Sequence, residues 1–271
     1  MQNGNGILNS MVRSYFDIQR SRIAISNRIS AFKRGHSGAK EEREDKSTFL
    51  VKLGTIQDDF QESEGQIEKE IAIELQRYPI WVEWLSMVKG VGPILGGVMI
   101  TSFDIERNTV SKWWQYAGLN PGMIEGWVPD GVDIVDKGKA TERKVPRWKR
   151  SGEMIRGDKL TAGYRSPFNK WLRTQLCGKL GPSFLKCGSE YALRFYYPLH
   201  VPKARRDELG MGRLDAEDGW KEKKEGHRSR AANRYMVKMF LVDFYNQWRI
   251  MEGLPVRVSY AEEYLGRQHS A

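Results

Sequence analysis

Apolar residues recur at steps of three and four through the first third of the chain, which is the spacing of an amphipathic helix. One stripe runs from Leu8 to Phe32 and a second from Leu50 to Tyr78. Gly35-His36-Ser37-Gly38 and the charged run at 41–46 interrupt the pattern between them. The pattern therefore predicts two long helices joined by a polar loop. Such an antiparallel hairpin, over residues 1–80, can fold on itself or pair with a second copy.

From Trp81 onward the predicted elements are shorter. The pattern predicts helices at 81–88, Ile94–Ile100, Thr109–Ala117, Ser166–Lys179, Pro182–Tyr197 and His227–Met251. Many glycines and prolines between 122 and 163 indicate loops, with a short β-ribbon around Gly131–Lys137 and Arg143–Arg150. Residues 198–226 are polar, and from Pro255 we expect an extended tail in which Tyr260 and Tyr264 pack back. The expected fold is mainly α: a helical hairpin at 1–80, then a helical domain at 81–271 with a small ribbon insertion.

The distribution of charge separates these two parts. The net charge is +10, yet residues 1–80 hold 12 basic and 12 acidic residues. The excess lies in residues 81–271, and the stretch Lys137–Arg173 alone holds 12 basic residues against three acids. A concentrated basic region is typical of a protein with a polyanionic partner. A basic surface that serves solubility is the alternative.

The turn Lys89-Gly90-Val91-Gly92 is the strongest local motif. It follows a Trp-rich segment and precedes a helix of small apolar residues that starts at Pro93. Two glycines around one apolar residue let the backbone turn tightly and expose N–H groups at a helix N-terminus, which suits a phosphate. Lys89 lies beside the turn. We therefore predict a helix-hairpin-helix that contacts DNA phosphates, with an ordinary tight turn between helices as the alternative.

Further candidate nucleic-acid contacts lie downstream. Trp148 stands among cations that suit a backbone together with a stacked base, and the group comprises Lys144, Arg147, Lys149 and Arg150. Lys159 and Arg165 extend the same basic stretch. His227, Arg228, Arg230 and Arg234 open the late helix, where cations are unfavourable unless an anion binds. A surface strand anchored by one Trp and a solvated first helical turn are the respective alternatives.

Catalytic and metal signals are weak. No nucleotide-binding loop, zinc-protease motif or clustered metal-ligand spacing occurs, and Cys177 and Cys187 are read as reduced thiols of a cytosolic protein. Ser151-Gly152 is a candidate nucleophile, or simply a turn. We expect no cofactor, with Mg²⁺ only if the protein is catalytic. No apolar run has the length of a membrane span and no signal peptide is recognisable, so we expect a cytoplasmic protein of a bacterium or a phage-infected host.

Two segments together resemble a known family. Val88-Lys89-Gly90-Val91-Gly92-Pro93 followed by Trp114-Gln115-Tyr116-Ala117-Gly118-Leu119-Asn120-Pro121 is similar to the carboxy-terminal domain of the DEDD insertion-sequence transposases of the IS one-ten and IS one-sixteen type. Tyr164–Lys170 and the helix Ala231–Trp248 look like those of compact phage and plasmid relatives, so the likeness covers roughly residues 50 to 265. The resemblance implies DNA binding in transposition or recombination, and a nucleophilic serine that matches Ser151.

The chain also departs from that family. The RuvC-like nuclease domain with its four acids is missing, and the segment from Pro121 to Ser151 is longer than expected. The leading hypothesis is therefore a DNA-binding protein that pairs through residues 1–80, with structured RNA as an alternative ligand. A recombinase that uses Ser151 and needs a partner nuclease domain is the second hypothesis. A phage protein that binds another protein or serves a structural role is the third.

Overall fold

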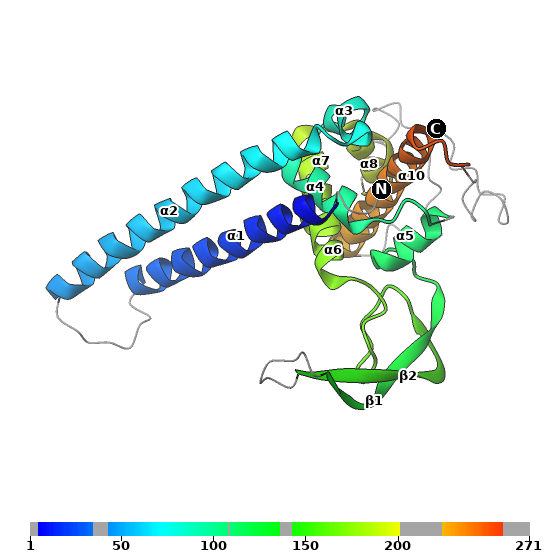
Figure 1. Cartoon of the computed structure of the whole chain (residues 1–271), viewed down its shortest axis with the longest axis horizontal. Coiled ribbons are helices and arrows are strands. Elements are labelled where there is room, and N and C mark those ends of the chain that lie inside the picture. Colours follow the sequence, from blue (N-terminus) through cyan, green and yellow to red (C-terminus); the bar gives the residue numbers. More distant parts are fainter. Residues whose placement is uncertain (1–4, 35–42, 108, 136–142, 201–223, 257–271) are drawn as a thin grey trace. The chain divides into compact units, whose positions relative to one another are not determined.

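The computed structural model describes residues 5–34, 43–107, 109–135, 143–200 and 224–256 (Figure 1). In this part of the chain the fold is mainly α, with a single two-stranded antiparallel sheet. Contacts divide the chain into two units. Unit 1 comprises residues 1–87 and 92–102, and unit 2 comprises residues 88–91 and 103–271. The first unit thus extends past residue 80 and includes the helix that follows the Gly-Val-Gly turn.

Unit 1 is built on the predicted helical hairpin. Helices α1 (Asn5–Lys33) and α2 (Arg43–Leu75) lie side by side along their length (Figure 1). Their apolar stripes face each other, and the best buried positions are Leu8, Val12, Ile71 and Leu75. The predicted helices are confirmed, and the stripe positions are buried or half-buried except Ile56 of α2, which is 42% exposed.

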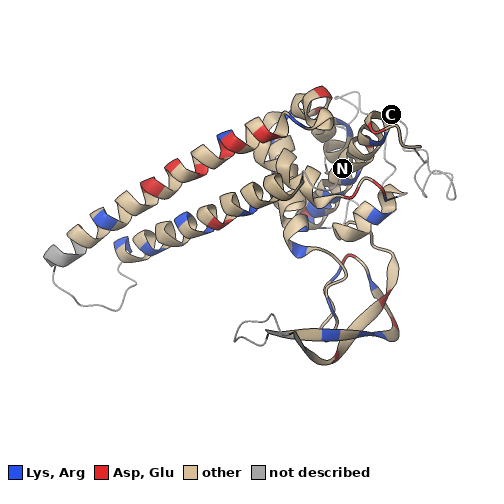
Figure 2. Cartoon of the chain, viewed as in Figure 1, with Lys and Arg blue, Asp and Glu red and all other residues tan. Residues whose placement is uncertain are grey.

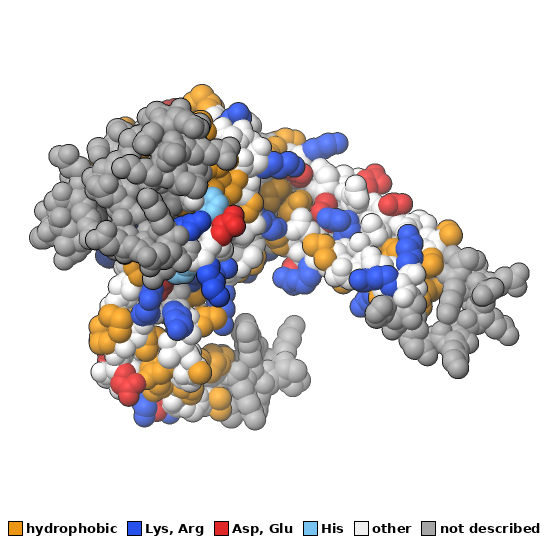
Figure 3. All heavy atoms as spheres, turned by 180° about the vertical axis from the view of Figure 1, so that it is seen from behind, with side chains coloured by type: hydrophobic (Ala, Val, Ile, Leu, Met, Phe, Trp, Pro, Cys, Tyr) orange, Lys and Arg blue, Asp and Glu red, His pale blue; other side chains and the backbone are white. Residues whose placement is uncertain are grey.

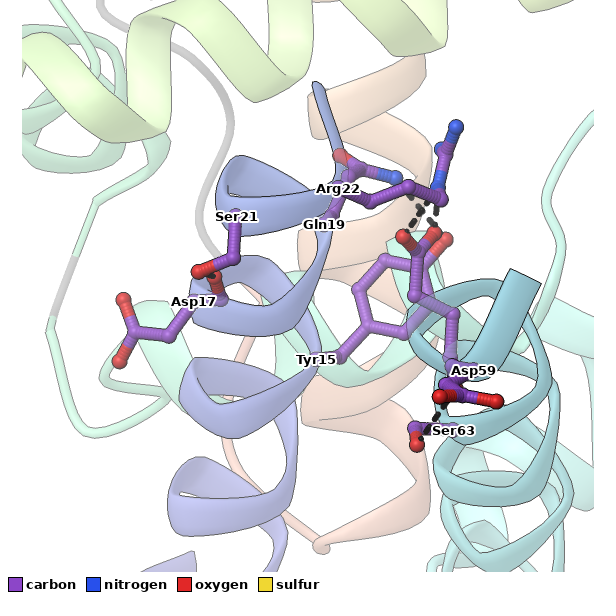
Figure 4. A network of polar contacts seen from close by, with 8 residues as sticks. Tyr15, Asp17, Gln19, Ser21, Arg22, Asp59 and Ser63 are labelled. Carbon is purple, nitrogen blue, oxygen red and sulfur yellow. Dashed lines mark hydrogen bonds and ion pairs between the residues drawn. The ribbon is translucent and has the colours of Figure 1, made fainter. Parts of the chain in front are cut away.

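A polar contact fixes α1 against α2 midway along the hairpin (Figure 4). The Arg22 guanidinium donates to Glu64 through Nε, at 2.5 Å, and through Nη2, at 3.3 Å. The Glu64 side chain is only 9% exposed, so the pair is partly desolvated. The nearby Tyr15 hydroxyl accepts a hydrogen bond from Gln19, and its pKa is raised by burial and by the Glu64 carboxylate. A two-pronged contact of this kind selects one alignment of the two helices.

Short helices close unit 1. They are α3 (Pro79–Glu83), the 3₁₀ turn η1 (Leu85–Met87) and α4 (Pro93–Ser102). Two glycines let α4 approach its neighbours closely. A Cβ atom at Gly96 would collide with the ring of Trp81, and one at Gly97 would lie 2.8 Å from Cγ2 of Val12. The small-residue composition of α4 therefore has a packing role within unit 1.

Unit 2 is organised around α10 (Glu225–Met251), whose buried side is aromatic. Three shorter helices pack against it: α5 (Val110–Tyr116), α7 (Gly181–Cys187) and α8 (Tyr197–His200). A further helix, α6 (Lys170–Gln175), packs against the π-helical turn that follows it. Trp113 lies within 5.4 Å of Phe244, centroid to centroid, and its indole N–H donates to the Asp104 carbonyl. Tyr245 donates its hydroxyl to the Arg107 carbonyl. Buried polar ends of these aromatic side chains are thus paired with backbone acceptors.

Two π-helical turns are caused by the prolines that come after them. They are η2 (Leu176–Leu180) and η3 (Ala192–Tyr196), and each precedes an X-Pro pair, Gly181-Pro182 and Tyr197-Pro198. A proline lacks the N–H that a helix needs and its ring crowds the carbonyl four residues earlier, so the backbone widens there. At the first turn, Asn233 of α10 supplies the missing donor to the Cys177 carbonyl, at 2.8 Å.

The sheet of unit 2 is a β-ribbon, longer than the sequence predicted. Strand β1 (Met123–Val135) pairs antiparallel with β2 (Arg143–Arg156). The register shifts between Glu125 and Trp127 and again between Pro129 and Val132. These bulges accommodate residues that disfavour regular pairing and that hid the strand pattern in the sequence. Residues 136–137 of the predicted ribbon lie outside the described residues.

Other predicted boundaries also shift. The helix expected from Ser166 begins at Lys170, because the Asn169 side chain caps it by accepting from the Leu172 N–H. The helix expected over Pro182–Tyr197 is interrupted at Gly188, which is left-handed with φ of 59°. Most of the polar segment 198–226, together with Tyr260 and Tyr264, lies outside the described residues. Within the described chain, no helix combines the length and the apolar character needed to cross a membrane.

Candidate nucleic-acid interface

The first half of the predicted hairpin, Val88–Val91, is packed against α7 within unit 2. Gly90 has a φ of 100°, and its carbonyl accepts a 2.7 Å hydrogen bond from the Ser183 hydroxyl. A Cβ atom at Gly90 would lie 2.9 Å from both Phe184 Cδ1 and Cys187 Sγ. The Val91 side chain is buried. Packing alone therefore requires glycine at position 90, and its substitution tests folding rather than ligand contact.

The second half of the hairpin is more open. A Cβ atom at Gly92 would meet nothing within 4 Å, and Gly92 is exposed. Its carbonyl accepts the Gly96 N–H and so starts α4 directly after the turn. Lys89 is exposed in the turn itself. Of the four hairpin residues, Lys89 and Gly92 are thus the two that remain accessible to a ligand.

The β-ribbon brings tryptophans and arginines onto one side. Trp127 is opposite Arg150 in the register, and Pro129 is opposite Trp148, so all four residues share a face. The Arg150 guanidinium lies 5.8 Å from the Trp127 ring centroid, and that of Arg165 lies 6.0 Å from the Trp148 centroid. The Arg165 N–H also donates to the Trp127 carbonyl, at 2.8 Å. We call Trp127, Trp148, Arg150 and Arg165 the Trp–Arg face.

The remaining ribbon cations are partly neutralised by neighbours. Arg147 and Lys149 both pair with Asp130, and Arg150 pairs with Glu125. All three cationic side chains are more than half exposed, so these are solvated ion pairs of small energy. Lys144 lies in β2, and Lys159 is exposed in the turn after it. Figure 2 shows basic residues along β2, whereas the charged residues of β1 are all acidic. The predicted basic cluster is thus divided between the two faces of β2, with Trp148 and Arg150 on one face and Arg147 and Lys149 on the other.

A second basic group was not predicted as a unit. Arg156 at the end of β2, Arg173 in α6 and Arg234 in α10 converge on Asp158. Arg156 donates to both carboxylate oxygens, at 2.9 and 3.0 Å, while Arg173 donates to the Asp158 backbone carbonyl, at 2.5 Å. Arg234 lies 3.9 Å from the carboxylate. We call these four residues the arginine cluster. Arg156 and Asp158 are close in sequence, but Arg173 and Arg234 come from separate helices, so no local motif indicated the whole group.

The start of α10 continues this basic region. Arg230 and Arg234 lie one helical turn apart, and Arg228 and His227 are in the same first turns. Ser229 shares a 3.0 Å hydrogen bond with the Tyr196 hydroxyl, which ties this end of α10 to η3. One turn further along, the Lys238 ammonium lies 4.2 Å from the Trp114 ring centroid, and burial lowers the pKa of that lysine. Figure 3 shows basic side chains gathered above the ribbon, toward the helices of the same unit.

Ser151, the predicted nucleophile, lies in the larger ribbon bulge. Three residues of β2, Ser151 to Glu153, oppose Gly126 alone, and Gly152 has a φ of 76°. The Ser151 hydroxyl donates to the Gly126 carbonyl, at 3.1 Å, and accepts the Glu153 N–H, also at 3.1 Å. Tyr164 donates to the Glu153 carboxylate, and this hydrogen bond raises the pKa of the phenol. These bonds give the hydroxyl a structural role in the bulge, and its nucleophilic role stays a prediction.

Metal ligands do not gather in the described part of the chain. There, no group of three or more His, Cys, Asp or Glu side chains is arranged to hold an ion. The Cys177 thiol has its pKa raised by burial, against the opposing effect of Arg173 and Arg234. The side chains that do gather on unit 2 are guanidinium groups and indole rings.

Comparison of the chain with models of protein families, with curated proteins and with solved structures gave no match. The transposase-like resemblance of the hairpin and of the Tyr-Ala-Gly-Leu-Asn-Pro segment accordingly stays a prediction. Function is therefore inferred from the residues of unit 2 themselves.

Proposed function

We propose that this protein binds DNA through unit 2, in the transposition or recombination of a mobile element or phage. The Trp–Arg face is the observation that carries the proposal. It presents guanidinium groups that pair with phosphates and indole rings that stack on bases, with Arg150 on the ribbon and Arg165 in the segment that follows it. A two-stranded ribbon also has the width to enter the major groove of a duplex.

Charge outside the ribbon supports the same assignment. Residues 81–271 carry the whole positive excess of the chain, and Lys89, Lys159, Arg228 and Arg230 extend it beyond the Trp–Arg face. Contacts of this type position a duplex and carry little sequence information. The protein accordingly acts as a sequence-tolerant holder of DNA, and unit 1 contributes little charge to the interaction.

The test is DNA binding measured as a function of salt. Fluorescence anisotropy with a labelled duplex, between about 50 and 200 mM salt, should show affinity falling steeply for the wild type. Arg150→Gln combined with Arg165→Gln removes two guanidinium groups and should reduce the salt slope by about 2.

Arg13→Gln combined with Arg20→Gln provides the matched control. Both of these arginines are exposed on α1, so the same charge is removed from unit 1. The control should bind like the wild type. Equal losses in the two double variants would show that only net charge matters and would contradict a role for the Trp–Arg face. Absence of salt-dependent binding by the wild type would contradict the proposed function itself and favour a protein partner.

A further inference from the structure

The arginine cluster holds more positive charge than its own carboxylate can neutralise. Arg156, Arg173 and Arg234 come from three different elements and meet at Asp158, whose side chain is only 9% exposed. Like charges brought together repel each other, and partial burial weakens the screening by water. One carboxylate offsets one of the three positive charges. The described residues thus leave an excess of two positive charges at this point.

The guanidinium groups also have donors to spare. Each carries several N–H donors in a planar fork. Among the described residues, Arg156 uses two of these donors on Asp158, Arg173 uses one on a backbone carbonyl, and Arg234 is only loosely paired at 3.9 Å. Arg234 is about one-third exposed and Arg156 about half exposed, so their outer donors reach solvent. A planar fork with unused donors matches the oxygens of a phosphate.

The elements that supply the cluster are held firmly. The Asp158 carbonyl is bound by Arg173, whose guanidinium also lies 4.7 Å from the Phe168 ring centroid. Arg234 is fixed on α10, where the neighbouring Asn233 is bonded to the backbone of η2. Asp158 thus orients the cations without cancelling them. Preorganised charge of this kind binds an anion at little further cost in side-chain entropy.

We propose that the arginine cluster is a phosphodiester-binding site, at which Arg156 and Arg234 clamp one backbone phosphate of a nucleic acid while Asp158 and Arg173 hold them in place. The inference rests on the proposed function and names the point where the backbone is anchored. It adds a contact on the helices and on the end of β2, separate from the Trp–Arg face. DNA and RNA share this chemistry, so the experiment must distinguish them.

The test compares salt slopes for a labelled DNA duplex and an RNA duplex of the same sequence. Arg156→Gln combined with Arg234→Gln should lower the slope by about 1 to 2 and weaken binding at least tenfold near 100 mM salt. Arg156→Lys combined with Arg234→Lys keeps the charge, so its slope should stay near that of the wild type while its affinity falls through loss of the fork. A cluster that served folding alone would not change the slope.

Arg107→Gln is the matched control, because Arg107 is an exposed arginine of unit 2 that pairs with Asp104 at 3.0 Å. It should leave the slope almost unchanged. A lower slope in the Gln variant on RNA alone would support the site with RNA as its ligand. If the Gln variant unfolds normally with temperature and keeps the salt slope of the wild type, the arginine cluster is not a phosphate-binding site, although DNA binding by unit 2 still holds. A wild type that binds neither duplex would overturn both.

Discussion

At the scale of single residues, burial shifts the pKa of a side chain that the sequence did not single out. Asp243 of α10 accepts a 2.8 Å hydrogen bond from the Tyr191 hydroxyl. Burial raises the pKa of the Asp243 carboxyl, against the opposing effects of Tyr191 and Arg194. Tyr191 stacks on Phe184, the ring that also packs against Gly90. The charge of Asp243 is therefore linked to the packing beneath the hairpin turn.

This raised pKa predicts a pH-dependent stability. In the folded chain Asp243 keeps its proton to a higher pH than in the unfolded chain. Its contribution to the free energy of unfolding is therefore fully present below about pH 4. It is lost as the pH rises through the folded-state pKa. In the Asp243→Asn variant, the amide oxygen still accepts the hydrogen bond from Tyr191, and the side chain does not titrate. The melting temperature of the variant, relative to that of the wild type, should therefore increase as the pH rises from 4 to 7.

Thermal unfolding of both proteins over that pH series is the measurement. All other titrating groups are common to the two chains, so the difference between their melting temperatures isolates Asp243. A difference that stays constant with pH would contradict the expected shift. Glu252→Gln, at an exposed residue after α10, is the control for the loss of one carboxylate.

At the scale of elements, α4 shows a conflict between local helix propensity and packing. Adjacent glycines disfavour a helix, yet both lie in the middle of α4 because neighbouring side chains leave no room for a Cβ atom. Gly97→Ala would place its methyl group 2.8 Å from Val12. Val12 is β-branched and buried, so its side chain has little freedom to move away from the added methyl group. We expect a loss of about 1–3 kcal/mol in the free energy of unfolding.

Gly65→Ala in α2 is the matched comparison. A Cβ atom there would meet nothing within 4 Å, so the helix should gain up to about 1 kcal/mol from the better helix former. Urea unfolding of both variants gives the two free energies with opposite expected signs. If both variants lost the same free energy of unfolding, backbone flexibility, and not close packing, would explain the glycines of α4.

The same elements show why part of the fold could be predicted. Long stripes such as Leu8 to Phe32 were sufficient to predict α1, α2 and α10, because periodicity accumulates over many turns. The ribbon was underestimated because Pro129 and Gly131 lie at a bulge and interrupt the alternation. The π-helical turn η2 depends on how Pro182 is accommodated by Asn233, a residue far along the chain. The arginine cluster likewise depends on contacts between distant residues, which no local pattern reveals.

At the scale of the whole molecule, the two units differ in charge and in exposed surface. Unit 2 carries the cations and the aromatic side chains of the proposed DNA-binding surface. In unit 1, α2 exposes large apolar side chains, among them Phe49 at 44% and Ile56 at 42%. These two residues are seven positions apart and so lie on the same side of the helix, as in a coiled-coil seam. The Phe49 ring also contacts the Phe32 ring of α1, at 5.2 Å between centroids, so its other edge is the part left exposed. We propose that this side of the hairpin pairs two copies of the chain.

Pairing through α2 predicts a linked change in assembly and in DNA binding. Wild type should sediment as a dimer, and Phe49→Gln combined with Ile56→Gln should shift it toward monomer, since an apolar seam is lost without any change of net charge. A monomer brings one unit 2 to the duplex in place of two, so its salt slope should be about half that of the dimer. Met123→Gln combined with Met154→Gln, at ribbon residues that are 55% and 58% exposed, removes similar apolar surface from unit 2 and should remain dimeric. A wild type that sediments as a monomer at micromolar concentration would contradict pairing through α2 and would leave each copy to hold DNA alone.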